Sequence, residues 1–125
     1  MSKSNTLPAV LITGCSSGAG RATALKFANA GYPTYATARR LDSIKDLEKA
    51  GCHILSLDVT YQNTIDKTVK TIEQKYGSVG ILINNAAIGI MTPIETVPIE
   101  TVRQQYETNV FGLLAVTQSV IPKMR

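Results

Sequence analysis

The chain has 125 residues, of which 44% are hydrophobic and 18% are charged. This balance excludes a disordered or collagen-like chain, and the length suits one domain of roughly 100–200 residues. Thirteen Lys and Arg against nine Asp and Glu leave a formal charge of +4, but apart from Arg39 and Arg40 the basic residues are scattered, which argues against a nucleic-acid-binding surface.

Short apolar runs alternate with longer helical patterns along the chain. Strands are predicted over residues 9–13, 34–38, 53–57 and 81–84. Helices are predicted between these strands and after the last one, most clearly over 60–76 and 102–124. Gly31, Gly51 and Gly77 each follow a helical segment, and each is predicted to end its helix with a left-handed backbone conformation.

Two of the helices have a recognisable apolar face. Ile65, Val69, Ile72 and Tyr76 recur at helical spacing within 60–76, and Thr60 is expected to cap this helix. The apolar face predicted for the last helix consists of Val110, Leu113, Leu114, Thr117, Val120, Ile121 and Met124.

The alternation of strands and helices predicts an α/β fold with a doubly wound parallel sheet between two layers of helices. Residues 1–125 are interpreted as one domain, incomplete at the C-terminus. The reason is that Ile81-Leu82-Ile83 form an apolar strand with no later strand to pair beside it. Such an edge promotes association, so we expect either a covering partner or a longer protein.

A glycine-rich segment, Thr13-Gly-Cys-Ser-Ser-Gly-Ala-Gly20, follows the first strand and opens a helix. Glycines at these spacings permit a tight turn and close approach of backbone amides to a pyrophosphate at the helix N-terminus. A turn without a ligand is the alternative, but the flanking strand and helix favour nucleotide binding. The candidate cofactor-binding residues of this loop are Gly14, Ser16, Ser17, Gly18, Ala19 and Gly20.

Four motifs in order resemble the short-chain dehydrogenase/reductase family, and the resemblance covers the chain from about Pro8 to its end. They are the glycine-rich segment, Leu57-Asp-Val-Thr60, Asn84-Asn-Ala-Ala87 and Asn109-Val-Phe-Gly112. The resemblance implies a Rossmann-like fold, a nicotinamide cofactor, a small-molecule carbonyl or alcohol substrate, and a homo-oligomer for the full-length protein.

The resemblance also implies roles for particular residues. Asp58 would accept a hydrogen bond from the adenine amino group, with Val59 beside the ring; otherwise Asp58 only favours the following helix N-terminus. The turn formed by Asn85, Ala86 and Ala87 would pack against the adenosine, or else is an ordinary polar strand end.

Two further positions bear on the active site. Asn109 resembles the family's active-site asparagine, which supports a bound water; a solvent-facing asparagine is the alternative. Ala87 departs from the glycine usual in the family, and its methyl group is unfavourable if this position requires a positive φ or close approach of the cofactor.

The end of the second strand predicts the choice of cofactor. An NAD site has an acidic residue roughly 20 residues beyond the glycines, whereas this chain has Arg39 and Arg40 there. Guanidinium groups suit a phosphate, so NADP(H) is favoured over a pair of merely solvated arginines.

The catalytic Tyr-x-x-x-Lys of the family is absent from these 125 residues, since no tyrosine has a lysine four positions later. By the family pattern, the catalytic Ser, Tyr and Lys would lie beyond Arg125, and these residues alone are predicted to be inactive. The leading hypothesis is the cofactor-binding part of an NADP(H)-dependent oxidoreductase. The alternative is a non-catalytic NADP-binding sensor or interaction module.

The remaining features indicate a cytoplasmic protein without metal. Cys15 and Cys52 lack metal-ligand spacing and are predicted to be reduced thiols. Residues 1–8 carry no apolar signal segment, and no apolar run reaches the ~18 residues of a membrane span. His53, the single histidine, is interpreted as structural.

Overall fold

The computed structural model describes residues 7–125; most of the N-terminal segment predicted to lack a signal therefore lies outside the described residues. Four parallel strands form one sheet in the order β3-β2-β1-β4. The strands are β1 (Val10–Ile12), β2 (Thr34–Ala38), β3 (His53–Ser56) and β4 (Ile81–Ile83). The predicted strands are confirmed, although three of them are one or two residues shorter than expected.

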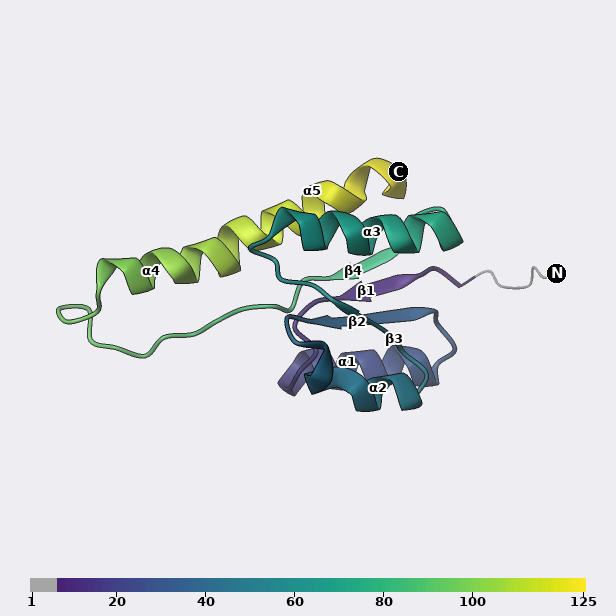
Figure 1. Cartoon of the computed structure of the whole chain (residues 1–125), viewed down its shortest axis with the longest axis horizontal. Coiled ribbons are helices and arrows are strands. Elements are labelled where there is room, and N and C mark those ends of the chain that lie inside the picture. The colour runs from purple at the N-terminus through teal and green to yellow at the C-terminus, as the bar shows by residue number, and fades with distance from the viewer. Residues whose placement is uncertain (1–6) are drawn as a thin grey trace.

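Helices cover both faces of the sheet (Figure 1). One face carries α1 (Gly18–Asn29) and α2 (Lys45–Lys49), which follows a short 3-10 turn (Leu41–Ile44). The other face carries α3 (Gln62–Tyr76) and α5 (Leu113–Met124), while α4 (Ile99–Tyr106) extends past the end of the sheet. A π-helical segment (Glu107–Gly112) joins α4 to α5. The three-layer, doubly wound fold predicted from the sequence is confirmed.

The sheet separates two hydrophobic clusters because alternate side chains of a strand point to opposite faces. Leu11 and its neighbour Tyr35 pack with α3 and α5 through residues such as Ile65 and Val116. The next pair in register, Ile12 and Ala36, packs in the second cluster with Ala24 and Leu47 of the opposite layer. The central strands β1 and β2 are buried along their whole length, which explains their continuous apolar character.

The helix ends confirm some expectations and correct others. Gly31, Gly51 and Gly77 all have positive φ, between 87° and 104°. The expected cap at Thr60 is wrong, because α3 begins at Gln62 with Tyr61 in the N-cap position. The last helix begins at Ile99 rather than residue 102 and contains the π-helical segment.

The predicted apolar face of the last helix is mostly exposed. Of its seven residues only Val120 is fully buried, and Val110, Leu113, Leu114, Ile121 and Met124 are exposed. Val116, which was not part of the predicted face, is fully buried with Val120 in the cluster that also contains residues of α3 and the sheet. The buried face of this helix therefore differs from the predicted one. As expected, β4 pairs only with β1 within the described residues and lies at an edge of the sheet.

Candidate nucleotide-binding cleft

A cleft of about 660 Å³ lies at the carboxyl ends of the parallel strands. Ligands of open α/β sheets bind outside these strand ends. The cleft is lined by Gly14, Ser16, Ser17, Ala38, Arg39, Leu57, Asp58, Val59, Thr60, Tyr61, Asn85, Ala86, Ala87, Ile88, Gln104, Glu107 and Thr108. Residues from three of the four motifs and from the end of β2 are thus brought to one place, while the Asn109-Val-Phe-Gly112 motif lies beside the lining residue Thr108.

Each of the three glycines in the loop occupies its position for a different structural reason. Gly14 has a φ of +69°, and a Cβ there would lie 2.8 Å from Cα of Ala86. At Gly20 a Cβ would lie 2.3 Å from Nδ2 of Asn85. Gly18 has a φ of +62°, but a Cβ there would meet no atom within 4 Å. Two glycines therefore allow the loop to pack on the 85–86 turn, while Gly18 borders open space.

Thr13 joins the glycine loop to the turn after β4. Its buried Oγ1 accepts hydrogen bonds from the backbone N–H groups of Asn85 (3.0 Å) and Ala86 (2.9 Å). The side chain of Asn85 makes a second connection between the turn and the loop, since its Nδ2 donates to the Gly14 carbonyl at 2.9 Å. Sequence reasoning assigned Thr13 no role of its own, although it is the first residue of the glycine-rich segment.

Asp58 turns back on its own loop rather than capping α3. Its Oδ1 accepts from the Thr60 N–H at 2.9 Å and from the Thr60 hydroxyl at 2.6 Å. Neither donor belongs to α3 itself, which begins at Gln62. Val59 is buried, and a Cβ on Gly112 would lie 2.5 Å from Cγ2 of Val59, which explains the glycine of the Asn109-Val-Phe-Gly112 motif.

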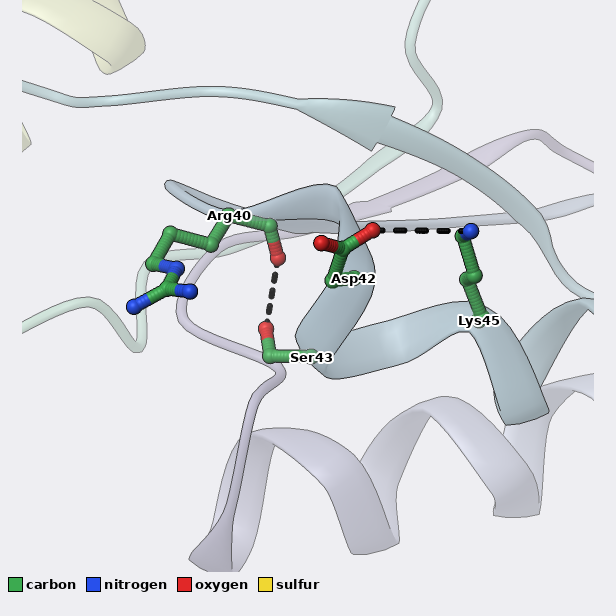
Figure 2. Close-up of polar contacts among 4 residues, drawn as sticks. All are labelled: Arg40, Asp42, Ser43 and Lys45. Atoms are coloured by element: carbon green, nitrogen blue, oxygen red, sulfur yellow. Dashed lines mark hydrogen bonds and ion pairs between the residues drawn. The ribbon is translucent and has the colours of Figure 1, made fainter.

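Arg39 and Arg40 lie in different surroundings although they are neighbours in sequence. Arg39 lines the cleft, and its backbone is held by the Ser56 hydroxyl, which donates to the Arg39 carbonyl at 3.0 Å. Arg40 does not line the cleft. Its carbonyl accepts from the Ser43 hydroxyl at 2.6 Å, and its guanidinium points away from Asp42, which faces Lys45 (Figure 2). Within residues 7–125 neither arginine forms an ion pair.

Five candidate residues of the sequence analysis do not line the cleft, namely Gly18, Ala19, Gly20, Arg40 and Asn109. Gly18 and Ala19 are exposed beside it at the start of α1, and Gly20 is buried beneath the loop. Conversely, sequence reasoning missed several residues that do line it. Among these are Tyr61 at the start of α3, and Gln104, Glu107 and Thr108 from α4 and the π-helical segment. They lie far from the glycine loop in sequence, so no local pattern connects them.

Asn109 fastens the π-helical segment to the chain that follows β4. Its Oδ1 accepts from the Ile88 N–H at 2.8 Å and its Nδ2 donates to the Ile88 carbonyl at 2.7 Å. The side chain is therefore not simply solvent-facing. Ala87 does not require the positive φ that would favour glycine, because no residue other than glycine has a positive φ in the described part of the chain.

Replacing Asn109 with alanine is expected to lower the free energy of unfolding by about 1–3 kcal/mol, because two backbone groups of Ile88 lose their partner in a partly buried site. Urea denaturation followed by circular dichroism measures the change. Replacing Gln118, an exposed residue of α5, with alanine is the control. This substitution is expected to change the free energy of unfolding by no more than about 0.5 kcal/mol. Equal midpoints for the two variants would contradict a structural role of this amide.

The thiols and the histidine lie outside the cleft. Cys15 and Cys52 are free and buried; burial raises the pKa of Cys15 to about 11 and also raises the pKa of Cys52. Both thiols are therefore protonated near neutral pH, which makes them poor nucleophiles. His53 stacks on Tyr35 with ring centroids 4.7 Å apart, and desolvation with the nearby charge of Lys75 lowers its pKa.

Two other kinds of feature are absent from the described residues. No helix within residues 7–125 is long and apolar enough to cross a membrane. In the same stretch no three His, Cys, Asp or Glu side chains are grouped so as to hold a metal ion.

Comparison with known proteins defines the class. The family model described as short chain dehydrogenase matches residues 8–125. The chain belongs to the short-chain dehydrogenase/reductase family, and its Rossmann-like fold is the one expected from the four motifs.

Individual relatives agree with this assignment. The chain is 37% identical over 116 residues to the NADPH-dependent 3-dehydrocapnine reductase of Ornithobacterium rhinotracheale, covering 89% of this chain and 41% of that reductase. It is 37% identical over 112 residues to the NADPH-dependent 1-acyldihydroxyacetone phosphate reductase of Schizosaccharomyces pombe, covering 88% and 38%. The crystal structure of a short-chain dehydrogenase from Streptomyces avermitilis superposes with a TM-score of 0.90 at 35% identity, covering 96% and 45%. The chain thus spans less than half the length of these relatives.

Proposed function

We propose that this chain forms the NADP(H)-binding part of an oxidoreductase that transfers hydride to or from a carbonyl or alcohol substrate. The observation that carries the proposal is the position of Arg39. This cation lines the cleft at the end of β2, where an NAD site would have an acidic residue, and it has no ion-pair partner in residues 7–125. Two named relatives are NADPH-dependent, which supports the same choice.

The residues of the cleft fit such a cofactor along its length. Open space beside Gly18 allows phosphates to approach the amides at the start of α1, with the exposed Ser16 and Ser17 as hydroxyl donors. Arg39 would bind the 2′-phosphate, with Arg40 adding positive charge nearby. The bound cofactor would supply the hydride.

The remaining candidate residues would contact the adenosine part of the cofactor or support the site. Asp58 would accept from the adenine amino group, beside Val59. Asn85, Ala86 and Ala87 would pack against the adenosine. Asn109 would act in support, holding the segment that carries Thr108 against Ile88. Residues 1–125 would form a single domain, and the full-length protein a homo-oligomer acting on a small molecule.

Replacing Arg39 with aspartate is expected to weaken NADPH binding by roughly ten- to a hundredfold, because a charge-assisted hydrogen bond contributes about 1.5–3 kcal/mol. Calorimetric titration with NADPH and with NADH measures the change, and the variant's affinity for NADH is expected to fall much less. Arg40→Asp is expected to have a smaller effect, because that side chain does not line the cleft.

Lys70→Asp provides the matched control, since it makes the same charge change at an exposed position of α3 that does not line the cleft. Its NADPH affinity is expected to stay within about twofold of the unsubstituted chain at moderate ionic strength. Tighter binding of NAD+ than of NADP+ by the unsubstituted chain would overturn the proposed cofactor.

A further inference from the structure

Tyr61 presents an exposed aromatic ring at the cleft. Its side chain is 65% exposed, yet it lines the same cavity as Asp58, Val59 and the glycine loop. The other aromatic residues of the described chain lie elsewhere, so Tyr61 is the one aromatic among the lining residues. A large exposed ring beside a polar cleft is a frequent feature of binding sites.

The fold itself gives no reason for a tyrosine at this position. Tyr61 is the N-cap of α3, where Ser, Thr, Asp and Asn are preferred, and it makes no capping hydrogen bond through its side chain. Its ring pairs with no other ring, and its hydroxyl has no hydrogen bond, within residues 7–125. Packing and capping therefore leave the residue type unexplained.

The backbone of Tyr61, in contrast, is held firmly. Its N–H donates to the Asp58 carbonyl at 2.9 Å. Its own carbonyl accepts from the Thr64 hydroxyl at 2.8 Å, in the first turn of α3. A ring carried on a fixed backbone has little conformational entropy to lose when it stacks on a flat ligand.

We propose that Tyr61 is a stacking platform for the purine ring of the cofactor, an inference that rests on the proposed function. The surroundings suit a purine with an exocyclic amine. The carboxylate of Asp58 has its Oδ1 occupied by Thr60, and its Oδ2 has no partner in residues 7–125. An amine can donate to that oxygen while Val59 and the phenol ring provide apolar contact. Tyr61 thereby selects for the adenosine half of the cofactor and acts as a positioning residue.

The inference is tested with 2′,5′-ADP, which carries the adenine and the 2′-phosphate but no nicotinamide. Tyr61→Ala is expected to weaken its binding about five- to a hundredfold, since base–aromatic stacking has this effect in alanine substitutions. Tyr61→Phe, which keeps the ring and removes the hydroxyl, is expected to stay within about twofold. Proton NMR adds a direct readout, because ring currents shift the adenine C2 and C8 protons upfield only while the aromatic ring is present.

Tyr106→Ala is the matched control, since that tyrosine is similarly exposed but does not line this cleft; its affinity for 2′,5′-ADP is expected to be unchanged. Thermal unfolding of each variant separates loss of the ring from loss of the fold. Unchanged affinity and adenine shifts in a folded Tyr61→Ala variant would overturn the stacking role and leave the cofactor site standing. Failure of the unsubstituted chain to bind 2′,5′-ADP would overturn both this inference and the proposed function.

Discussion

Valine in place of Gly18 is expected to abolish NADPH binding, a loss of at least about a hundredfold, while the far-UV circular dichroism stays close to that of the unsubstituted chain. The space beside Gly18 is open in the protein, so a side chain there displaces a ligand rather than the core. The positive φ of +62° adds backbone strain of about 1–3 kcal/mol. Calorimetry with NADPH measures the first effect, and thermal unfolding measures the second.

Gly51→Val separates the two effects. Gly51 also has a positive φ and open space around it, but it lies just before β3, at the opposite end of the sheet from the cleft. This variant is expected to lose similar stability and to bind NADPH normally. If Gly18→Val retained the affinity of the unsubstituted chain, the loop would be only a structural turn.

The second large effect is the absence of turnover. These 125 residues are expected to oxidise no NADPH above background with aldehydes, ketones or quinones, because no tyrosine is followed four positions later by lysine. Loss of general acid–base catalysis alone lowers a rate by about 10²–10⁴. Absorbance at 340 nm measures the oxidation of NADPH.

The exposed edge at β4 has a second consequence for the same sample. Because β4 pairs on one side only within the described residues, edge-to-edge association is expected in light scattering. Turnover by a monodisperse 125-residue protein would contradict both expectations. The sensor hypothesis is tested by the reading frame beyond Arg125: a Ser followed by Tyr-x-x-x-Lys there indicates an enzyme, and its absence favours the sensor.

The parts of the fold that depend on short-range patterns were predictable from the sequence. The strand at 34–38 was recognisable from five consecutive residues alone. The glycines at 31, 51 and 77 were recognisable as helix ends because glycine readily adopts a positive φ. The glycine loop was identified for the same reason, since its spacing and its flanking strand and helix are all local.

The contacts that assemble the cleft join residues far apart in the chain, so the local periodicity of apolar residues does not predict them. Thr13 holds a turn 72 residues away, and Asn109 holds Ile88 across 21 residues. The cap expected at Thr60 was wrong because α3 begins at Gln62, with Tyr61 as its N-cap. The sequence gives no reason to distinguish the neighbouring residues Arg39 and Arg40. Only the path of the chain after β2 places Arg39 at the cleft and Arg40 outside it.

A titration of the isotopically labelled chain with NADPH, followed by ¹H–¹⁵N correlation NMR, tests most directly whether the cleft is the cofactor site. The largest shifts are expected at the amides of Gly14, Gly18, Arg39, Asp58 and Tyr61, with little change in α2, which does not line the cleft. No shifts at saturating NADPH, or shifts centred on α2 and the far end of α3, would contradict the assignment of this cleft to NADP(H).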